Sequence, residues 1–133
     1  MKLQKLISKL EKHHKKKLDL SLGRTFNLLK KLGDPQDKLK NVITVVGTNA
    51  KASMCYSLKS ILNQGGYKTN LYTSPHLLSY TERYVFEDKE INEEDLIELL
   101  TDVEKTLGDD NATLFEILTC AFLKYAENFK DNV

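Results

Sequence analysis

A short segment near the middle of the chain combines residue types that can hold a phosphate group. It is the run Gly47, Thr48, Asn49, Ala50, Lys51, Ala52 and Ser53. Residues 42–46, before it, are nearly all apolar and β-branched, which is typical of a buried strand. After it, apolar side chains recur at helical spacing until Gly65 and Gly66, which predict a helix end. A strand that turns into a helix through such a loop presents free backbone N–H groups beside a lysine, and this arrangement binds phosphate.

The loop does not meet the general phosphate-loop pattern G-x-x-x-x-G-K-[ST], because Lys51 follows Ala50 rather than a glycine. From the pattern alone, an ordinary strand-to-helix turn with an exposed lysine is an equally good interpretation. The loop nevertheless resembles the G-T-N-G-K-G-S loop of the folylpolyglutamate synthase/dihydrofolate synthase family, within the Mur ligase superfamily. The resemblance implies that residues 47–53 bind the phosphates of ATP and that Lys51 neutralises their charge during catalysis.

Two alanines in this loop replace glycines of the family pattern. The methyl groups of Ala50 and Ala52 restrict positive φ angles and crowd the phosphates. Related Mur ligases carry a threonine at the position of Ala52, so Ala50 is the more serious departure. If a position requires the left-handed conformation, alanine there costs about 1 to 2 kcal/mol.

Two more segments resemble family motifs, and both follow a second predicted strand at residues 67–73. Residues 73–77 read Thr-Ser-Pro-His-Leu and resemble a T/S-S-P-H-L signature, which implies that Ser74 contributes to a magnesium site and His76 to substrate binding. A serine hydroxyl is a weak magnesium ligand, so such a site also needs phosphate oxygens, water and a carboxylate. Residues 79–86 resemble the family's x-Y/F-T/N-E-R-I/V segment. Judged alone, Arg83 would be a surface salt-bridge residue, but in this segment it becomes a candidate for holding a substrate carboxylate or phosphate.

The resemblance places pterin binding on two segments that are far apart in the sequence. Residues 18–24 resemble a D-L-G-L-x-R element, with a serine in place of its glycine, and imply four pterin-site residues: Asp19, Leu20, Ser21 and Leu22. Residues 113–116 read Thr-Leu-Phe-Glu, match T-x-F-E, and imply that Phe115 and Glu116 line the same pocket. The spacing T-x-x-E alone predicts a capping box. Both interpretations can hold, since a capped helix start is a rigid place to display a binding residue.

The elements that position these residues follow from hydrophobic periodicity. An amphipathic helix is predicted by the stripe Leu3, Leu6, Ile7 and Leu10. A second helix ends at residues 33–35, a hairpin covers 84–91, and two further helices cover 92–107 and 113–128. The strand-helix-strand unit at 42–73 implies a parallel, right-handed crossover. The fold class is therefore α/β, with a helical segment at 1–40 and, at 41–133, the front part of a P-loop-containing parallel-sheet domain of the Mur ligase central-domain type.

The predicted sheet is too small for its helices. Parallel sheets normally have several strands buried on both faces, so we expect the chain to be the front of a larger protein. In the family, the Asp-x-Val at residues 131–133 opens the next core strand, whose glutamate completes the magnesium site. The rest of the sheet and a C-terminal glutamate-binding domain follow, so the isolated fragment is expected to be inactive.

Composition excludes several other classes of function. Lys and Arg number 20 and Asp and Glu number 19, so no charge excess favours nucleic acid or an anionic membrane as a partner. No apolar run approaches the roughly 20 residues that span a bilayer, and the N-terminus lacks the apolar core of a secretory signal, which predicts a cytoplasmic protein. Cys55 and Cys120 are expected to be reduced core residues, because no Cys/His spacing suggests zinc.

The resemblance implies an ATP-dependent amide ligase of folate biosynthesis and one-carbon metabolism. ATP, with Mg²⁺, would phosphorylate a carboxyl group of dihydropteroate or a reduced folate, and the amine of L-glutamate would attack the acyl phosphate. The partners would be these small molecules only, and the full-length protein would be a monomer. The alternatives are a catalytically inactive nucleotide- or pterin-binding module with a degenerate loop, and an unrelated P-loop kinase.

Overall fold

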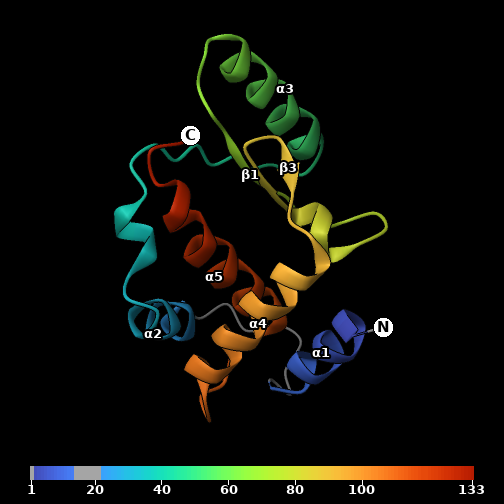
Figure 1. Cartoon of the computed structure of the whole chain (residues 1–133), viewed down its shortest axis with the longest axis vertical. Coiled ribbons are helices and arrows are strands. Elements are labelled where there is room, and N and C mark those ends of the chain that lie inside the picture. The colour runs from blue at the N-terminus through green and yellow to red at the C-terminus, as the bar shows by residue number, and fades with distance from the viewer. Residues whose placement is uncertain (1, 14–21) are drawn as a thin grey trace.

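The structure is a computed structural model that describes residues 2–13 and 22–133. Its α-helices are α1 (Lys2–Leu10), α2 (Gly23–Lys31), α3 (Lys51–Gln64), α4 (Glu93–Leu107) and α5 (Leu114–Ala126). Its strands are β1 (Asn70–Tyr72), β2 (Tyr84–Phe86) and β3 (Lys89–Glu90). The described residues also contain four short 3₁₀ helices: η1 (Glu11–His13), η2 (Pro35–Lys38), η3 (Tyr80–Arg83) and η4 (Glu127–Phe129). In Figure 1, α4 and α5 lie centrally, α1 and α2 lie beside them, and the sheet and α3 lie beyond one end.

Helices α4 and α5 supply the centre of the hydrophobic core. The side chains of α4 that are buried belong to the predicted apolar face: Leu96, Leu100, Val103 and Leu107. Asn92 caps this helix, because its side-chain oxygen accepts a hydrogen bond of 2.7 Å from the backbone N–H of Asp95. Helix α5 buries Ile117, Leu118 and Ala121. Burial also raises the pKa of the Cys120 thiol on this helix to about 12, and both cysteines are free thiols.

The N-terminal helices pack against this same core. Helix α1 buries Leu3, Ile7 and Leu10, as its stripe predicts. The carboxylate of Glu104, on α4, lies 2.9 Å from Lys9 Nζ and 3.0 Å from His13 Nε2. Burial raises the pKa of Glu104, but the hydrogen bonds from these two partners outweigh it and lower the pKa. The helices of residues 1–40 therefore share one core with later elements.

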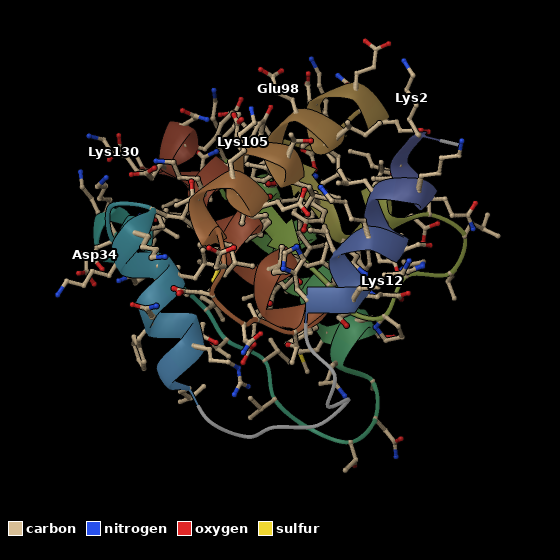
Figure 2. The ribbon with its side chains drawn as sticks, turned by 90° about the horizontal axis from the view of Figure 1, so that it is seen from below. Lys2, Lys12, Asp34, Glu98, Lys105 and Lys130 are labelled. Atoms are coloured by element: carbon tan, nitrogen blue, oxygen red, sulfur yellow. The ribbon has the colours of Figure 1, made fainter. Side chains whose placement is uncertain are left out.

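Charged side chains lie on the outside of the helical layer. Figure 2 shows Lys2, Glu98 and Lys130 at its periphery, with both signs of charge interspersed. The formal net charge is +1, so neither sign dominates the surface as a whole. Within the part of the chain that the structure describes, no helix is both long and apolar enough to cross a membrane.

The sheet is antiparallel, which corrects the prediction of a parallel sheet. Its order is β1-β2-β3, and both neighbouring pairs are antiparallel. The hairpin predicted at 84–91 is present, with a two-residue turn in which Glu87 and Asp88 have φ angles of 47° and 66°. Positive φ at both positions matches the twist of the flanking strands. Asp88 accepts hydrogen bonds from Lys59 and Asn63, so the acidic turn fastens α3 to the hairpin instead of being only a solvated tip.

The strand predicted at 42–46 does not form in this structure. Residues 39–47 have no regular secondary structure, and the side chains of Val42, Ile43 and Val46 are exposed. A strand requires hydrogen-bonding neighbours, and among the described residues none pairs with this segment. A cavity of about 300 Å³ separates the segment from β1 and α5, and Ile43, Leu71 and Phe122 are among its lining residues. The β-branched run is therefore placed beside β1 but does not extend the sheet.

One residue makes the contacts of a parallel strand next to β1. The backbone N–H of Val133 donates to Lys68 O at 3.0 Å, and Val133 O accepts from the Asn70 N–H at 2.8 Å. Two such bonds to residues i and i+2 of a neighbour are the parallel pattern. Val133 therefore lies beside β1 in the orientation of a parallel neighbour.

The exposed apolar side chains lead to a prediction for the 133-residue chain. No residue of α3 is buried, and Met54 and Ile61 lie open to solvent together with Val42, Ile43 and Val46. We expect the chain to bind a hydrophobic dye and to tend toward aggregation, because exposing many large apolar side chains to water is unfavourable. Dye fluorescence should fall in an Ile61→Lys, Val46→Thr variant with the same circular dichroism. A monomer with a sharp melt and no dye binding would contradict the prediction.

Candidate active site

The loop at residues 47–53 opens helix α3 through a left-handed residue. Ala50 precedes the first helical residue with φ 57° and ψ 15°, and its carbonyl accepts the 3.0 Å hydrogen bond from Met54 N that starts the helix. Ala52 lies inside the first helical turn. Of the two alanines, therefore, only Ala50 adopts the conformation that favours glycine. The sequence argument that Ala50 is the more serious departure agrees with this geometry.

Lys51 and the start of α3 together make a cationic, hydrogen-bond-donating surface. The first N–H groups of an α-helix have no acceptor within the helix, and no side chain caps α3. The ammonium group of Lys51 folds back and donates a 2.7 Å hydrogen bond to Gly47 O. The helix dipole adds partial positive charge at this end. The loop can therefore attract an anion, with the lysine held at its rim.

Ser74, His76 and Arg83, three predicted site residues, are brought together at the carboxyl end of β1. The Arg83 guanidinium donates from Nε to His76 Nδ1 at 2.9 Å and from Nη1 to Ser74 Oγ at 3.3 Å. It also lies 5.2 Å from the centroid of the Tyr80 ring, at cation–π distance. Burial, followed by the nearby Arg83 charge, lowers the pKa of His76. Because His76 Nδ1 accepts a hydrogen bond, the neutral imidazole has its proton on Nε2.

The interpretation of Arg83 as a surface salt-bridge residue is wrong. Its side chain is only 8% exposed, and no carboxylate among the described residues lies within ion-pair distance. Its net positive charge is therefore uncompensated by the described side chains around it. This positive charge favours the approach of an anionic group to the loop that carries Ser74 and His76.

Glu82 holds the loop that follows Ser74, and the sequence argument missed it. Its carboxylate accepts hydrogen bonds of 2.7 to 2.8 Å from the backbone N–H groups of Leu77, Leu78 and Ser79. These bonds, that from Leu77 first, lower the pKa of Glu82. The side chains of Leu77 and Leu78 remain almost fully exposed. The available signal was the spacing S-x-x-E at residues 79–82, which is a capping box for η3.

The predicted capping box at Thr113 is confirmed, and it has an additional partner. Thr113 Oγ1 accepts from Glu116 N at 3.2 Å, and Glu116 Oε2 accepts from Thr113 N at 2.7 Å. Arg24 donates from Nη2 to Glu116 Oε1 at 2.9 Å and from Nε to Oε2 at 3.3 Å. Burial raises the pKa of Glu116, but the bonds from Arg24 and Thr113 prevail and lower it. The last residue of the D-L-G-L-x-R element thus contacts the last residue of T-x-F-E.

The remaining pterin-site predictions have different outcomes. Leu22 and Phe115 are described and are 66% and 55% exposed, so both are accessible to a ligand. Phe115 is therefore not among the buried residues of α5. Asp19, Leu20 and Ser21 lie outside the described residues.

A hydrogen-bonded connection links the end of β1 to the start of α5. Tyr72 Oη and Thr119 Oγ1 are 3.3 Å apart, and Thr119 Oγ1 donates to Phe115 O at 2.8 Å. The Tyr72 ring also stacks on Phe122 with a centroid separation of 4.9 Å. The end of β1, two residues before Ser74, is therefore connected to the helix that displays Phe115. Among the described residues, no hydrogen bond joins the loop 47–53 to either group.

The described residues fit magnesium only in combination with a nucleotide. They contain no cluster of three or more His, Cys, Asp or Glu side chains that could hold a metal ion. The hydroxyl groups of Ser53 and Ser74 are hard oxygen donors of the kind that Mg²⁺ accepts, but they are neutral. The Arg83 cation beside Ser74 Oγ further disfavours a bare dication. Phosphate oxygens are needed to balance the charge.

The Glu116 ion pair gives a pH prediction. Because the pKa of Glu116 in the folded chain lies below its ordinary value of 4.5, the pair stabilises the fold above that pH. The contribution is lost as the pH falls through the folded pKa. We therefore expect the difference in free energy of unfolding between wild type and Glu116→Gln to narrow below about pH 4.5. Urea unfolding of both proteins from pH 7 downward measures it, and a difference that does not change with pH would contradict the prediction.

No protein-family model matches the chain, but curated proteins do. The dihydrofolate synthase/folylpolyglutamate synthase of Escherichia coli strain K12 is 38% identical over 117 residues, which are 88% of this chain and 28% of that protein. The dihydrofolate synthetase of Saccharomyces cerevisiae is 36% identical over 110 residues, which are 81% of this chain and 26% of that protein.

Solved structures show the same relationship. The structure of E. coli FolC in complex with DHPP and ADP matches with a TM-score of 0.91 at 36% identity, over 98% of this chain and 31% of that one. The Yersinia pestis bifunctional folylpolyglutamate synthase/dihydrofolate synthase complexed with AMPPNP and Mn ion matches with a TM-score of 0.89 at 32% identity, over 98% and 32%. The chain spans less than a third of the length of these relatives. In sequence and in fold, it belongs to the folylpolyglutamate synthase/dihydrofolate synthase family.

Proposed function

We propose that the protein is an ATP-dependent ligase that joins L-glutamate to dihydropteroate, to reduced folates or to both through an acyl phosphate. The carrying observation is the loop 47–53, which opens α3 with unpaired helical N–H groups and Lys51 at its rim. A relative that matches nearly the whole chain binds ADP and DHPP. Family membership leaves no support for the unrelated P-loop kinase.

In this proposal the chain's residues act by positioning and electrostatics. Backbone N–H groups of residues 49–53 hold the phosphates, and Lys51 moves from Gly47 O to the transferring phosphoryl group, where negative charge develops. Ser53 and Ser74 would hold Mg²⁺ together with phosphate oxygens. The metal, when bound, supplies charge neutralisation at those oxygens. Arg83 keeps the Ser74 hydroxyl in place and adds positive charge nearby.

The carboxyl-bearing substrate would lie between the starts of α2 and α5. Leu22 and Phe115 offer exposed apolar surface there, and an aromatic side chain can stack on a pterin ring. His76 would offer Nε2–H as a hydrogen-bond donor to the substrate. The proposal places the protein in the cytoplasm as a monomer with small-molecule partners only, and these points stay predictions.

The test is glutamate-dependent release of ADP by the full-length protein. We expect ADP release that requires ATP, Mg²⁺, L-glutamate and either dihydropteroate or a reduced folate, with the amide product identified by mass. The 133 residues alone should show none, because the family's glutamate site lies elsewhere. ADP release that is indifferent to glutamate and to both pterin substrates would overturn the proposal.

One observation favours a second candidate, an inactive nucleotide- or pterin-binding module. Ala50 keeps a methyl group at a left-handed position in the loop that must accept phosphates. ATP binding without turnover in the same assay would select the module over the enzyme.

A further inference from the structure

We propose that Arg24 is a positioning residue that holds the two segments of the candidate pterin site together through its ion pair with Glu116. The inference rests on the proposed function, because it concerns the binding of the pterin substrate. It changes the role of Glu116, which the family resemblance had suggested as a substrate-binding residue. In this structure the carboxylate of Glu116 binds Arg24 and Thr113 of the same chain, whereas the side chain of Phe115 is exposed to solvent.

The pair is bidentate and largely removed from water. Nη2 and Nε of Arg24 lie 2.9 and 3.3 Å from the two carboxylate oxygens of Glu116. The side chains are 17% and 11% exposed. Fork-to-fork geometry of this kind fixes orientation as well as distance, which a single ammonium cannot do.

Both oxygens of Glu116 are engaged by the protein. Oε1 accepts from Arg24, and Oε2 accepts from Arg24 and from the backbone N–H of Thr113 at 2.7 Å. A substrate donor would have to compete with a charge-assisted pair and a helix cap at once. Glu116 is therefore better suited to holding the start of α5 than to contacting the ligand.

Arg24 ties the start of α2 to helix α5. Leu22 occupies the N-cap position of α2. Arg24 lies two residues later and reaches across to α5, from a position 92 residues away in the sequence. A second contact joins the same elements, since Cys120 Sγ lies 3.9 Å from Thr25 O. The ion pair thus determines where exposed Leu22 lies relative to exposed Phe115.

A second ion pair at the other end of α2 supplies a matched control. Lys31 Nζ lies 2.8 Å from Asp110 Oδ2 and also ties α2 to the chain just before α5. Both of its side chains are 40% exposed, and neither neighbours Leu22 or Phe115 in the sequence. If the ion pairs served only to hold α2 against the rest of the protein, loss of either pair would change ligand affinity to a similar extent.

The experiment measures dissociation constants of dihydropteroate and of ADP, each alone, for the full-length protein and its variants. We expect Arg24→Met and Glu116→Gln each to weaken dihydropteroate binding about tenfold to hundredfold, as small misplacements of binding groups do. Glu116→Gln keeps an oxygen for the Thr113 cap, and Arg24→Lys, which keeps the charge but loses the fork, should restore only part of the affinity. ADP binding should be unchanged in all three, and Lys31→Met should leave both constants within about twofold.

The double variant Arg24→Met, Glu116→Gln should bind dihydropteroate no more weakly than the weaker single variant, because the two side chains act as one unit. Equal losses of dihydropteroate and ADP affinity, or an equal loss in Lys31→Met, would overturn the inference. So would wild-type affinity in Glu116→Gln, which tests the pair even if Arg24→Met folds poorly. A wild-type protein that binds no dihydropteroate would instead refute the proposed function.

Discussion

We expect turnover of the full-length protein to fall about 100-fold or more in Lys51→Ala, while the free energy of unfolding changes little. Removing one preorganised charge from the transferring phosphoryl group costs several kcal/mol of transition-state stabilisation. The fold should tolerate the change because the Lys51 side chain is exposed and its hydrogen bond to Gly47 O is local. Steady-state ADP release gives the rate, and urea unfolding gives the stability.

A lysine two turns along the same helix is the control for this substitution. Lys59 pairs with Asp88 of the hairpin turn, so Lys59→Ala removes the same charge from α3 but not from its N-terminus. We expect Lys59→Ala to lower stability slightly and to change turnover by less than about twofold. Similar losses of turnover in both variants would mean that the general charge of α3, and not a phosphate contact, supports the reaction. Unchanged turnover in Lys51→Ala would remove the lysine from the mechanism.

The helices were predictable from the sequence because their signals are local. The stripe of α1, the Asn92 cap of α4 and the T-x-x-E box of α5 each depend on residues no more than seven positions apart. The hairpin was predictable for the same reason, through its two-residue turn. The strand at 42–46 was not, because β-branched residues indicate only suitability for a sheet and the ladder needs a neighbour. In this structure β1 pairs with β2, and none of the described residues pairs with 42–46.

In the candidate site, too, the features set by neighbouring residues were predictable and the contacts between distant segments were not. Residues 47–53 were predictable as a unit because the loop is contiguous and its chemistry is in its backbone. The contacts of Arg83 with Ser74 and His76, and the contact of Glu116 with Arg24, were not, because each joins segments that no local pattern connects. The Arg24 contact crosses 92 positions, and nothing in the sequence distinguishes an arginine that faces Glu116 from one that faces solvent. Structure was also needed to separate the two alanines, since only φ shows that Ala50 is left-handed.

That difference between the alanines predicts opposite outcomes for one substitution made at two positions. Ala50→Gly should leave the free energy of unfolding similar or raise it by up to about 1 kcal/mol, because relief of left-handed strain exceeds the entropy that glycine adds to the unfolded chain. Ala52→Gly should lower it by roughly 0.5 to 1 kcal/mol, since Ala52 is helical. Urea unfolding of the two variants measures the contrast. Losses at both positions would refute the strain argument.

The same position decides how well the loop accepts phosphate. Ala50→Gly removes a methyl group beside the phosphates and should tighten ATP binding, with turnover similar or modestly raised. Ala50→Val adds bulk and β-branching at φ 57°, where branched residues are genuine outliers, and should weaken ATP binding at least tenfold. ATP affinity in the presence of Mg²⁺, measured by calorimetry on the full-length protein, should therefore follow the order glycine, alanine, valine. Equal affinity in all three would show that residue 50 does not shape the phosphate site. We expect the wild-type loop to bind ATP, because alanine removes no backbone donor from it. No ATP binding in any of the three proteins would contradict the proposed ATP-dependent ligase.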